Sequence, residues 1–372
     1  ANSSDHGKLS QRFHMELVYE LSRNKRWIIK TRFRKSAYKI NMKITGSLLL
    51  MGLLLSCSCT KKMHQARIVL LPDTQTYAEK YPEVLDSQIN WIANHAGEID
   101  FVLQQGDLTQ NNNNKEWAII KNAFTRLNNK VPYVLAAGNH DMGSKDGKFA
   151  DVRNSTLFNT YFPVAQMSKL NGFAGLAEDG KMDNAFYIFK KGKIKWLVIT
   201  LEFGPRNSIL TWAGSIIEKH PDHTVIINTH CYMYSDSTRQ GAGDNWRPQA
   251  YGVGKDKGES AVNDGEQIWE KLVKKYPNTR FVFSGHVLNS GVGTLISVNN
   301  AGNYVYQMLA NYQEGVKGSV KGGNGWLRIL DMDFKKKTLK VSTYSPFINQ
   351  FMDDPQHRFI IKNVLYKSET DE

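Results

Sequence analysis

Five short polar segments of the chain contain the residue types that bind divalent cations. They supply carboxylates, amides and imidazoles, and they are Asp73-Thr74-Gln75, Gly106-Asp107, Gly138-Asn139-His140-Asp141, His230 and Gly285-His286. Two divalent cations bridged by a carboxylate lower the pKa of a bound water and stabilise charge on phosphoryl oxygens. Taken singly, each segment is a common turn or a hydrogen-bonded histidine, so metal chemistry requires that the five meet in space.

Each of these segments follows a short apolar run that we predict to be a strand. The five runs are residues 67–71, 99–104, 132–137, 223–229 and 279–284. In an open α/β sheet the ligand crevice lies at the carboxyl ends of the strands. The sequence therefore predicts that the polar segments converge on one site.

The remaining pattern is that of an α/β domain. Apolar periodicity predicts helices over 83–95, 114–128, 206–219 and 264–276, and further strands over 183–189 and 194–201. Four later runs, 292–298, 303–310, 326–333 and 338–344, indicate one antiparallel series. We expect a single domain over 66–345, followed by a short C-terminal tail, 346–372.

The order of the motifs, with Gly-Asn-His in the middle and a strand-terminal Gly-His near the end, resembles the calcineurin-like metallophosphoesterase superfamily. The resemblance implies an α/β fold, a four-layer αββα sandwich of two mixed sheets. It also implies two divalent cations, drawn from Mn, Mg, Fe or Zn. In that pattern Asp73 binds the first cation, Asp107 bridges both, and His140 faces the substrate as the catalytic residue. The expected ligands of the second cation are Asn139, His230 and His286.

The sequence departs from the family pattern at two positions, and both concern the first cation. Gln75 and Leu288 stand where the family usually has histidines. Gln75 can still offer an amide oxygen, whereas Leu288 offers no ligand, and the neighbouring Asn289 is a replacement candidate. An oxygen-dominated first site would suit Mg²⁺, Mn²⁺ or Ca²⁺. A two-cation enzyme, a one-cation enzyme and a degenerate binding protein all remain open.

The function that this pattern favours is hydrolysis of a phosphomonoester or phosphodiester of a small molecule by metal-activated water. One alternative is a non-catalytic envelope protein that binds a phosphorylated ligand in the same cleft, and another is a fold that only displays an interaction surface. The long loop 234–262 contains Arg239 and Trp246, which suit a phosphate and a flat group respectively. The same loop can equally be a solvated one in which Trp246 packs locally.

The formal charge of +13 invites a nucleic-acid interpretation, but its distribution argues against one. Residues 1–62 contain 13 Lys/Arg and three acidic residues, while the rest of the chain has 35 basic against 32 acidic residues. No basic groove or aromatic-interleaved basic motif is visible in the body, so we predict no nucleic-acid partner. Three cysteines exclude a disulfide framework. The sequence carries no signal for the oligomeric state.

The amino-terminal part contains an apolar run, 44–56, that is shorter than the roughly 20 residues of a membrane-spanning helix. Together with Lys43 it fits a secretory signal, and the following Cys57 resembles the lipidated cysteine of bacterial lipoproteins. We therefore predict a signal and tether over 42–65, an upstream extension over 1–41, and a protein lipid-anchored at a membrane of the bacterial envelope. The alternative is a short helix at the edge of the domain.

Overall fold

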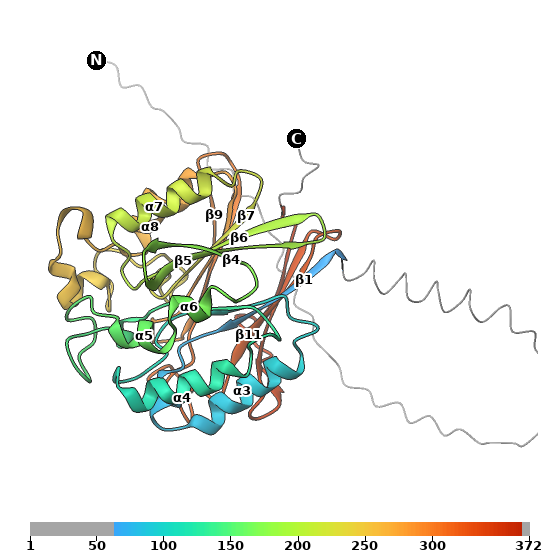
Figure 1. The fold of residues 1–372 in the computed structure, drawn as a ribbon. Coiled ribbons are helices and arrows are strands. Elements are labelled where there is room, and N and C mark those ends of the chain that lie inside the picture. Colours follow the sequence, from blue (N-terminus) through green and yellow to red (C-terminus); the bar gives the residue numbers. More distant parts are fainter. Residues whose placement is uncertain (1–62, 367–372) are drawn as a thin grey trace, which may run out of the picture.

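The computed structural model describes residues 63–366 of the chain. The extension 1–41, most of the segment 42–65 with Cys57, and residues 367–372 lie outside the described part. Two seven-stranded mixed sheets pack face to face, and helices cover both outer faces (Figure 1). The predicted αββα sandwich is thus confirmed.

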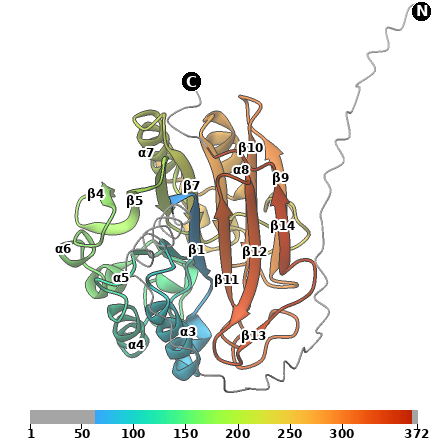
Figure 2. The same ribbon diagram turned by 90° about the vertical axis from the view of Figure 1, so that its right-hand side faces the viewer.

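The first sheet has β1 near its centre, with parallel neighbours on one side and antiparallel ones on the other (Figure 2). Its main path is β13 (Gln350–Phe351), β12 (Thr338–Ser345), β11 (Leu327–Asp333), β1 (Gln65–Leu71), β2 (Phe101–Gln104) and β3 (Tyr133–Val134). Strand β14 (Arg358–Lys362) also pairs with β12. Because β1, β2 and β3 are parallel, the segments that follow them emerge at the same edge.

The second sheet has a parallel centre as well. Its order is β4 (Phe173–Glu178), β5 (Lys181–Lys191), β6 (Ile194–Leu201), β7 (Thr224–Thr229), β8 (Thr279–Ser284), β10 (Tyr304–Ala310) and β9 (Val292–Val298). Strands β6, β7, β8 and β10 run parallel to one another, whereas β5 and β9 pair antiparallel with β6 and β10. The polar residues after β7 and β8 therefore also emerge together, facing those of the first sheet.

Four helices form the outer layers (Figure 1). Helices α3 (Pro82–Asn94) and α4 (Asn114–Thr125) cover the first sheet, and α7 (Asn207–Glu218) and α8 (Gly265–Lys271) cover the second. Short helices α2 (Gln75–Glu79), α5 (Thr156–Tyr161) and α6 (Val164–Met167) lie in connections. Five 3₁₀ turns span Asn139–Asp141, Pro248–Ala250, Gly252–Lys255, Gly258–Ser260 and Val273–Lys275. The Asp264 side chain caps α8, and the helix ends at Lys271 rather than at the predicted residue 276.

The space between the sheets is filled by apolar side chains from both. Phe101 of β2 stacks on Phe189 of β5 with 4.8 Å between ring centroids, and Phe189 lies 5.8 Å from Trp196 of β6. These rings are continuous with Val69 and Phe283 in one buried cluster. The sheets are therefore held at a fixed separation, which sets the distance between the polar segments at their edges.

Three expectations from the sequence need correction. The four late strands do not form one series, because β9 and β10 join the second sheet while β11 and β12 join the first. The strand expected over 132–137 pairs only at Tyr133 and Val134, since the chain then leaves the sheet edge toward Asn139. The first sheet also continues past residue 345, because β14 pairs with β12. Alternating apolar residues identify strands but not their partners.

Candidate metal centre

Four predicted ligands meet at the carboxyl ends of the parallel strands. Nε2 of His230, after β7, lies 3.1 Å from Oδ1 of Asp107, after β2. The same nitrogen lies 3.1 Å from Oδ1 of Asn139, which follows β3, and 3.1 Å from Nδ1 of His286, which follows β8. All four side chains are buried. Residues up to 179 positions apart in the chain thus share one enclosed space.

Backbone carbonyls fix which nitrogen of each imidazole is free. Nδ1 of His230 lies 2.8 Å from the Gln105 carbonyl oxygen, and Nε2 of His286 lies 2.7 Å from the Trp246 carbonyl oxygen. A carbonyl only accepts, so each of these nitrogens carries the proton. In the neutral rings the other nitrogens then present lone pairs, together with the oxygens of Asp107 and Asn139. Four such electron pairs require a positive charge between them, and this donor set fits a transition-metal ion.

The ionisation of these groups indicates the same requirement. Burial alone would lower the pKa of His230, but the Asp107 carboxylate outweighs it and raises that pKa to about 9. Burial and then the charge on His230 lower the pKa of His286 to about 3. Burial would raise the pKa of Asp107, yet the imidazoles of His230 and His140 hold it well below its usual value. The space beside Asp107 therefore holds one positive charge, either a proton on His230 or a cation.

A second group of polar side chains lies on the other side of Asp107. Asp73, after β1, accepts hydrogen bonds at Oδ2 from the His286 amide at 3.1 Å and from Nε2 of Gln313 at 3.0 Å. Gln75 donates from Nε2 to Oδ2 of Asp107 at 3.0 Å, and the same amide contacts Oε1 of Gln313. The two glutamines therefore connect the two carboxylates.

This group fits a hard cation after one small change. Oε1 of Gln75 is buried and has no hydrogen-bond partner within residues 63–366. Rotating the terminal amides of Gln75 and Gln313 by a half turn exchanges their nitrogen and oxygen atoms with little change of shape. Burial, helped by the charge of Asp107 and opposed by His230, raises the pKa of Asp73 to about 8. An uncompensated carboxyl among amide oxygens suits Mg²⁺, Mn²⁺ or Ca²⁺.

Gln313 is a functional candidate that the motif analysis did not assign. It lies 238 residues from Gln75, in the loop after β10, so no local spacing connects the two. Asn289, the suggested replacement ligand, is exposed and donates to Oγ of Ser235 at 3.0 Å instead. Leu288 offers only carbon atoms, as the sequence indicates.

Asp141 holds two of the metal-binding loops together. Its buried carboxylate accepts hydrogen bonds from the backbone amides of Leu108, Thr109 and Gly138 at 2.9 to 3.0 Å. Burial, and then Asp107, raises the pKa of Asp141 to about 6, while these amides oppose the shift. Asp141 ends the Gly138-Asn139-His140-Asp141 segment, whose sequence alone assigns it no role. Its contacts make it the residue that fixes Asp107 relative to Asn139.

Glycines beside the carboxylates leave no room for a side chain. A Cβ at Gly285 would lie 2.1 Å from Oδ1 of Asp73, and a Cβ at Gly138 would lie 2.1 Å from Oδ1 of Asp107. The backbone itself is unusual at two ligands, since φ is 51° at Asp107 and 74° at His286. Such conformations persist only where surrounding contacts hold them, and they concentrate at functional sites.

His140 lies at the edge of the cluster, next to an open pocket. Its backbone amide donates to Oδ1 of Asp107 at 2.9 Å, and its Nδ1 lies 2.8 Å from the Gln110 carbonyl oxygen. Nε2 has no hydrogen-bond partner in the described part of the chain, and the ring packs against Phe149. The adjoining pocket has a volume of about 270 Å³. It is lined by polar side chains, those of Thr76, Glu79, Lys80, Gln110, His140, Gln313 and Glu314.

The two substrate-binding candidates of the long loop have other contacts. Arg239 donates from Nε to Glu266 at 2.9 Å, and its guanidinium lies 4.5 Å from the ring centroid of Trp269. The structure therefore does not bring Arg239 into the metal cluster. Trp246 contributes its carbonyl oxygen to His286, while its indole packs near Tyr234. A backbone carbonyl carries no residue-specific signal, so the sequence could not reveal this role.

Comparison with known proteins identifies the class. The chain belongs to the calcineurin-like phosphoesterase family, whose model matches residues 66–290, and the resemblance read from the motifs is confirmed. Membership supports a metal-dependent phosphoesterase in general terms.

Individual relatives are distant. Uncharacterized protein YvnB of Bacillus subtilis (strain 168) is 27% identical over 289 residues, which are 75% of this chain and 20% of YvnB, so the chain spans about a fifth of that relative. Purple acid phosphatase PPD1 from yellow lupin (Lupinus luteus) seeds is similar with a TM-score of 0.48 and 17% identity, over 80% of this chain and 54% of its own. The inner-membrane-complex anchor GAP50 of Plasmodium has a TM-score of 0.44 and 11% identity, over 82% of this chain and 90% of GAP50.

Replacing the Asp141 carboxylate, which holds the loops of Asp107 and Asn139 together, should release metal although no predicted ligand is changed. In Asp141→Ala three buried amides lose their acceptor, so we expect the free energy of unfolding to fall by about 3 kcal/mol. We also expect less cation per chain by elemental analysis. Asp146→Ala, an exposed position five residues further on, is the control. Parent-like stability together with parent-like metal content in Asp141→Ala would rule out the positioning role.

A methyl group at Gly285 should displace Asp73. We expect Gly285→Ala to bind fewer cations per chain than the parent, measured by isothermal titration with Mn²⁺, because the new Cβ would lie only 2.1 Å from Oδ1 of Asp73. Gly97→Ala is the matched control, since no atom lies within 4 Å of its added Cβ. Unchanged stoichiometry and affinity in Gly285→Ala would show that Asp73 is not needed for binding.

Proposed function

We propose that this chain is a metal-dependent phosphoester hydrolase, acting on a phosphomonoester or phosphodiester through metal-activated water. The observation that carries the proposal is the convergence of three ligand atoms around a fourth, Nε2 of His230, with His140 at the edge of the cluster. Bound divalent cations at such a centre activate water and stabilise charge on the phosphoryl oxygens. The protein supplies the ligands, their orientation and a proton donor.

Asp107 is the residue that connects the two halves of the centre. Its Oδ1 faces His230 and its Oδ2 faces Gln75, so each oxygen can serve a different cation. Residues that would hold the second cation are Asn139, His230 and His286. The first would be held by Asp73, by Asp107 and by the amide oxygens of Gln75 and Gln313. The two sites therefore differ in chemistry, one containing imidazoles and the other only oxygen ligands.

His140 is positioned to act on the leaving group. Its Nδ1 proton is engaged by the Gln110 carbonyl, so the ring cannot turn freely, and Nε2 is the nitrogen available to a substrate. A protonated Nε2 would donate to the departing oxygen of the phosphoester, and thereby avoid an unstable alkoxide.

The pocket beside His140 favours a small, polar phosphorylated substrate. Its lining residues include Lys80, which pairs with both Glu79 and Glu314 at its rim. An extended apolar or flat leaving group would find few partners among these polar side chains.

We also propose that a lipid on Cys57 anchors the protein at a membrane of the bacterial envelope, which follows from the apolar run 44–56.

A binding protein is the second candidate, and one observation favours it. The amides of Gln75 and Gln313 already link Asp73 to Asp107 through hydrogen bonds, so both carboxylates of the first site have partners without a cation. A chain with only the second cation could hold a phosphorylated ligand without hydrolysing it. Turnover measurements separate the two candidates.

Turnover should depend on the centre in a residue-specific way. With p-nitrophenyl phosphate and its bis-ester, and Mn²⁺, Mg²⁺, Fe²⁺ or Zn²⁺ added in turn, we expect Asp107→Asn to lose activity and metal together. His140→Ala should lose about a hundredfold or more in turnover while metal content stays at the parent level, because it removes only the proton donor. His64→Ala, an exposed imidazole outside the centre, should match the parent.

Two results would contradict this assignment. If His140→Ala turned over both substrates at the parent rate, the histidine would not act on the leaving group. If the parent bound one cation firmly but hydrolysed neither ester with any of the metals, the binding protein would be the better description.

A further inference from the structure

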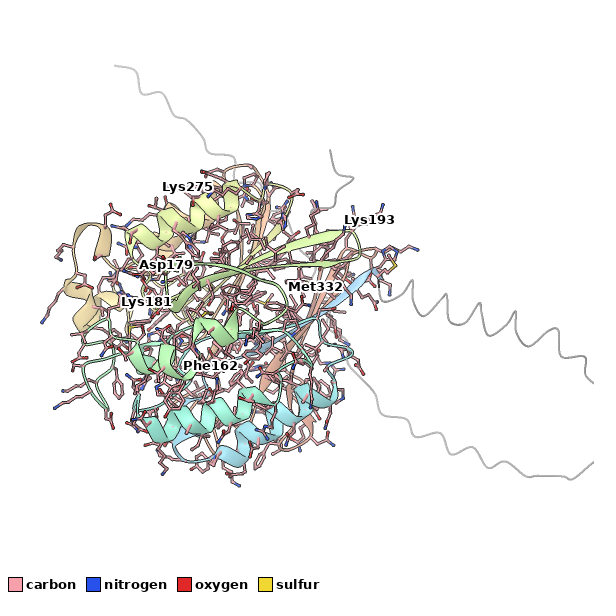
Figure 3. All side chains as sticks on the ribbon, viewed as in Figure 1. Phe162, Asp179, Lys181, Lys193, Lys275 and Met332 are labelled. Carbon is pink, nitrogen blue, oxygen red and sulfur yellow. The ribbon has the colours of Figure 1, made fainter. Side chains whose placement is uncertain are left out.

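The end of the molecule opposite the metal centre has a basic surface that no part of the proposed chemistry uses. Three segments form it, namely the start of β1, the β5–β6 turn and the β11–β12 turn. The Phe334 amide donates to the His64 carbonyl at 2.9 Å, and Val364 donates to the Lys337 carbonyl at 2.8 Å. In Figure 3 Lys193 lies at this end of β5, and Lys181 lies at the other. Strand β1 alone, with seven residues, separates the basic surface from Asp73 by about 23 Å.

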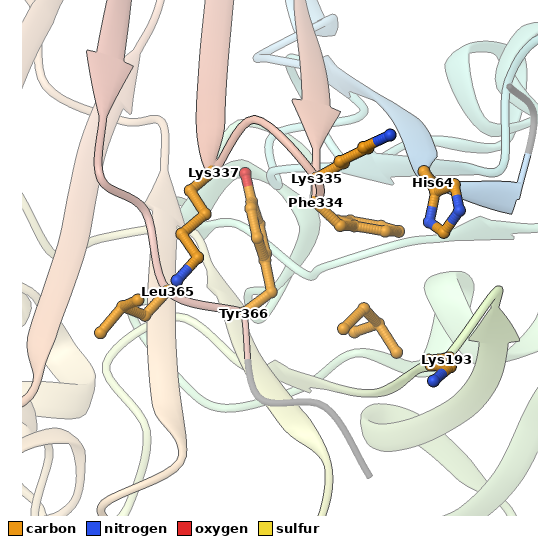
Figure 4. Close-up of a pocket in the computed structure, with 8 residues that line it drawn as sticks. His64, Lys193, Phe334, Lys335, Lys337, Leu365 and Tyr366 are labelled. Carbon is orange, nitrogen blue, oxygen red and sulfur yellow. The ribbon is translucent and has the colours of Figure 1, made fainter. Parts of the chain in front are cut away.

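A hollow of about 350 Å³ occupies the centre of this surface (Figure 4). Its apolar lining comes from Ile194, Phe334, Leu365 and Tyr366, its cationic lining from Lys193, Lys335 and Lys337, and His64 adds an imidazole. Two turns and the start of β1, distant in sequence, therefore place basic groups around one apolar depression.

The positive charge here is not neutralised by the protein. The acidic neighbours are already paired, since Lys191 contacts Asp100 at 2.5 Å, Lys195 contacts Asp222 at 2.6 Å and Lys336 contacts Asp333 at 3.8 Å. No ion pair joins the ammonium groups of the other three lysines to any carboxylate within residues 63–366. Those lysines, all exposed, are Lys193, Lys335 and Lys337.

Exposed apolar side chains accompany these lysines. Met63 is 52% exposed and Leu365 is 48% exposed, although both are large hydrophobic residues. The Met63 carbonyl lies directly over Gly192 of the β5–β6 turn, so Met63 belongs to the same surface. Lysines interspersed with exposed apolar groups are the composition of surfaces that sit at the headgroup region of a bilayer.

The sequence upstream of Met63 indicates what this surface faces. Residues 1–62 contain the apolar run 44–56 and 13 Lys/Arg, and they join the described chain at this end. Only six residues lead from Cys57 to Met63, and a chain of that length reaches at most about 20 Å. If the upstream segment is attached to a membrane, the basic surface therefore lies close to that membrane.

We propose that this basic end docks on a membrane surface rich in anionic phospholipid. A lipid phosphate lies among Lys193, Lys335 and Lys337 over the hollow, and Met63 and Leu365 enter the interfacial region. The strands then run away from the bilayer, so the metal centre at their carboxyl ends opens toward the aqueous phase. Soluble substrates can reach His140 while the protein is docked.

Hydrogen exchange on vesicle-bound full-length protein tests this orientation. The comparison uses vesicles of phosphatidylcholine alone and of phosphatidylcholine mixed with phosphatidylglycerol, with Cys57→Ser in every sample so that no acyl chain contributes. Hydrogen exchange reports which face of the protein contacts the lipid. This readout does not depend on how tightly residues 1–62 bind the chain to the vesicle. We expect slower exchange at 191–195 and 334–337 with the anionic vesicles only, and no change at 230–233.

Matched variants give the quantitative test. Each lysine near an anionic surface contributes about fivefold to binding, so Lys193→Gln, Lys335→Gln and Lys337→Gln together should weaken docking about a hundredfold and abolish the protection. Lys145→Gln, Lys255→Gln and Lys257→Gln remove the same charge from exposed positions elsewhere and should leave the protection intact. The thermal unfolding midpoint shows that both triple variants remain folded.

Three outcomes would overturn the proposal. They are equal protection of the two turns by neutral and anionic vesicles, absence of protection with anionic vesicles, and undiminished protection in the lysine variant of this surface. Protection of these turns by an acidic protein, but by neither vesicle, would assign the surface to a protein partner instead.

Discussion

The buried side chains around Asp107 need a positive charge between them, and this need organises the centre. Two backbone carbonyls, those of Gln105 and Trp246, keep the outward nitrogens of His230 and His286 protonated. The inward nitrogens must then share a buried space with carboxylate and amide oxygens. Such an arrangement is unstable without a cation or a proton at its centre, so the fold provides a cation site by controlling which atoms carry hydrogen.

The two halves of the centre provide a cation site with different kinds of ligand. On the side of His230 the ligands include two imidazoles, which favour a transition metal. On the side of Asp73 the glutamines Gln75 and Gln313 can either hydrogen-bond the carboxylates to each other or turn oxygen toward a hard cation. Half turns of these two amides therefore distinguish a first site closed by hydrogen bonds from one that presents oxygen atoms to a cation.

The parallel strands at the centre of both sheets give the molecule two unlike ends. At their carboxyl ends the backbone leaves the sheets in tight turns, and these turns hold the candidate metal ligands and the polar pocket near His140. At their amino ends the hairpin turns hold exposed lysines around an apolar hollow. Chemistry and surface attachment can therefore occupy opposite ends, because strand length keeps them apart.

Much of this could be predicted from the sequence. Strand β6 occupies the predicted residues, 194–201, because a long apolar run between polar turns needs no tertiary information to be recognised. The ligands Asp107, Asn139, His230 and His286 follow predicted strands, and the parallel-sheet rule brings such residues together. The composition of the chain likewise separated the basic segment 1–62 from a nearly neutral body.

Only the tertiary structure decided the remaining partners, and the reason is physical. Gln313 reaches Asp73 across 240 residues, and Asp141 acts through backbone amides that every residue possesses, so neither contact leaves a local pattern. Strands β10 and β11 are adjacent in sequence yet belong to different sheets, because alternation shows which face is buried but not which neighbour pairs. Residue types set the chemistry that is available, whereas packing of the two sheets set which groups meet.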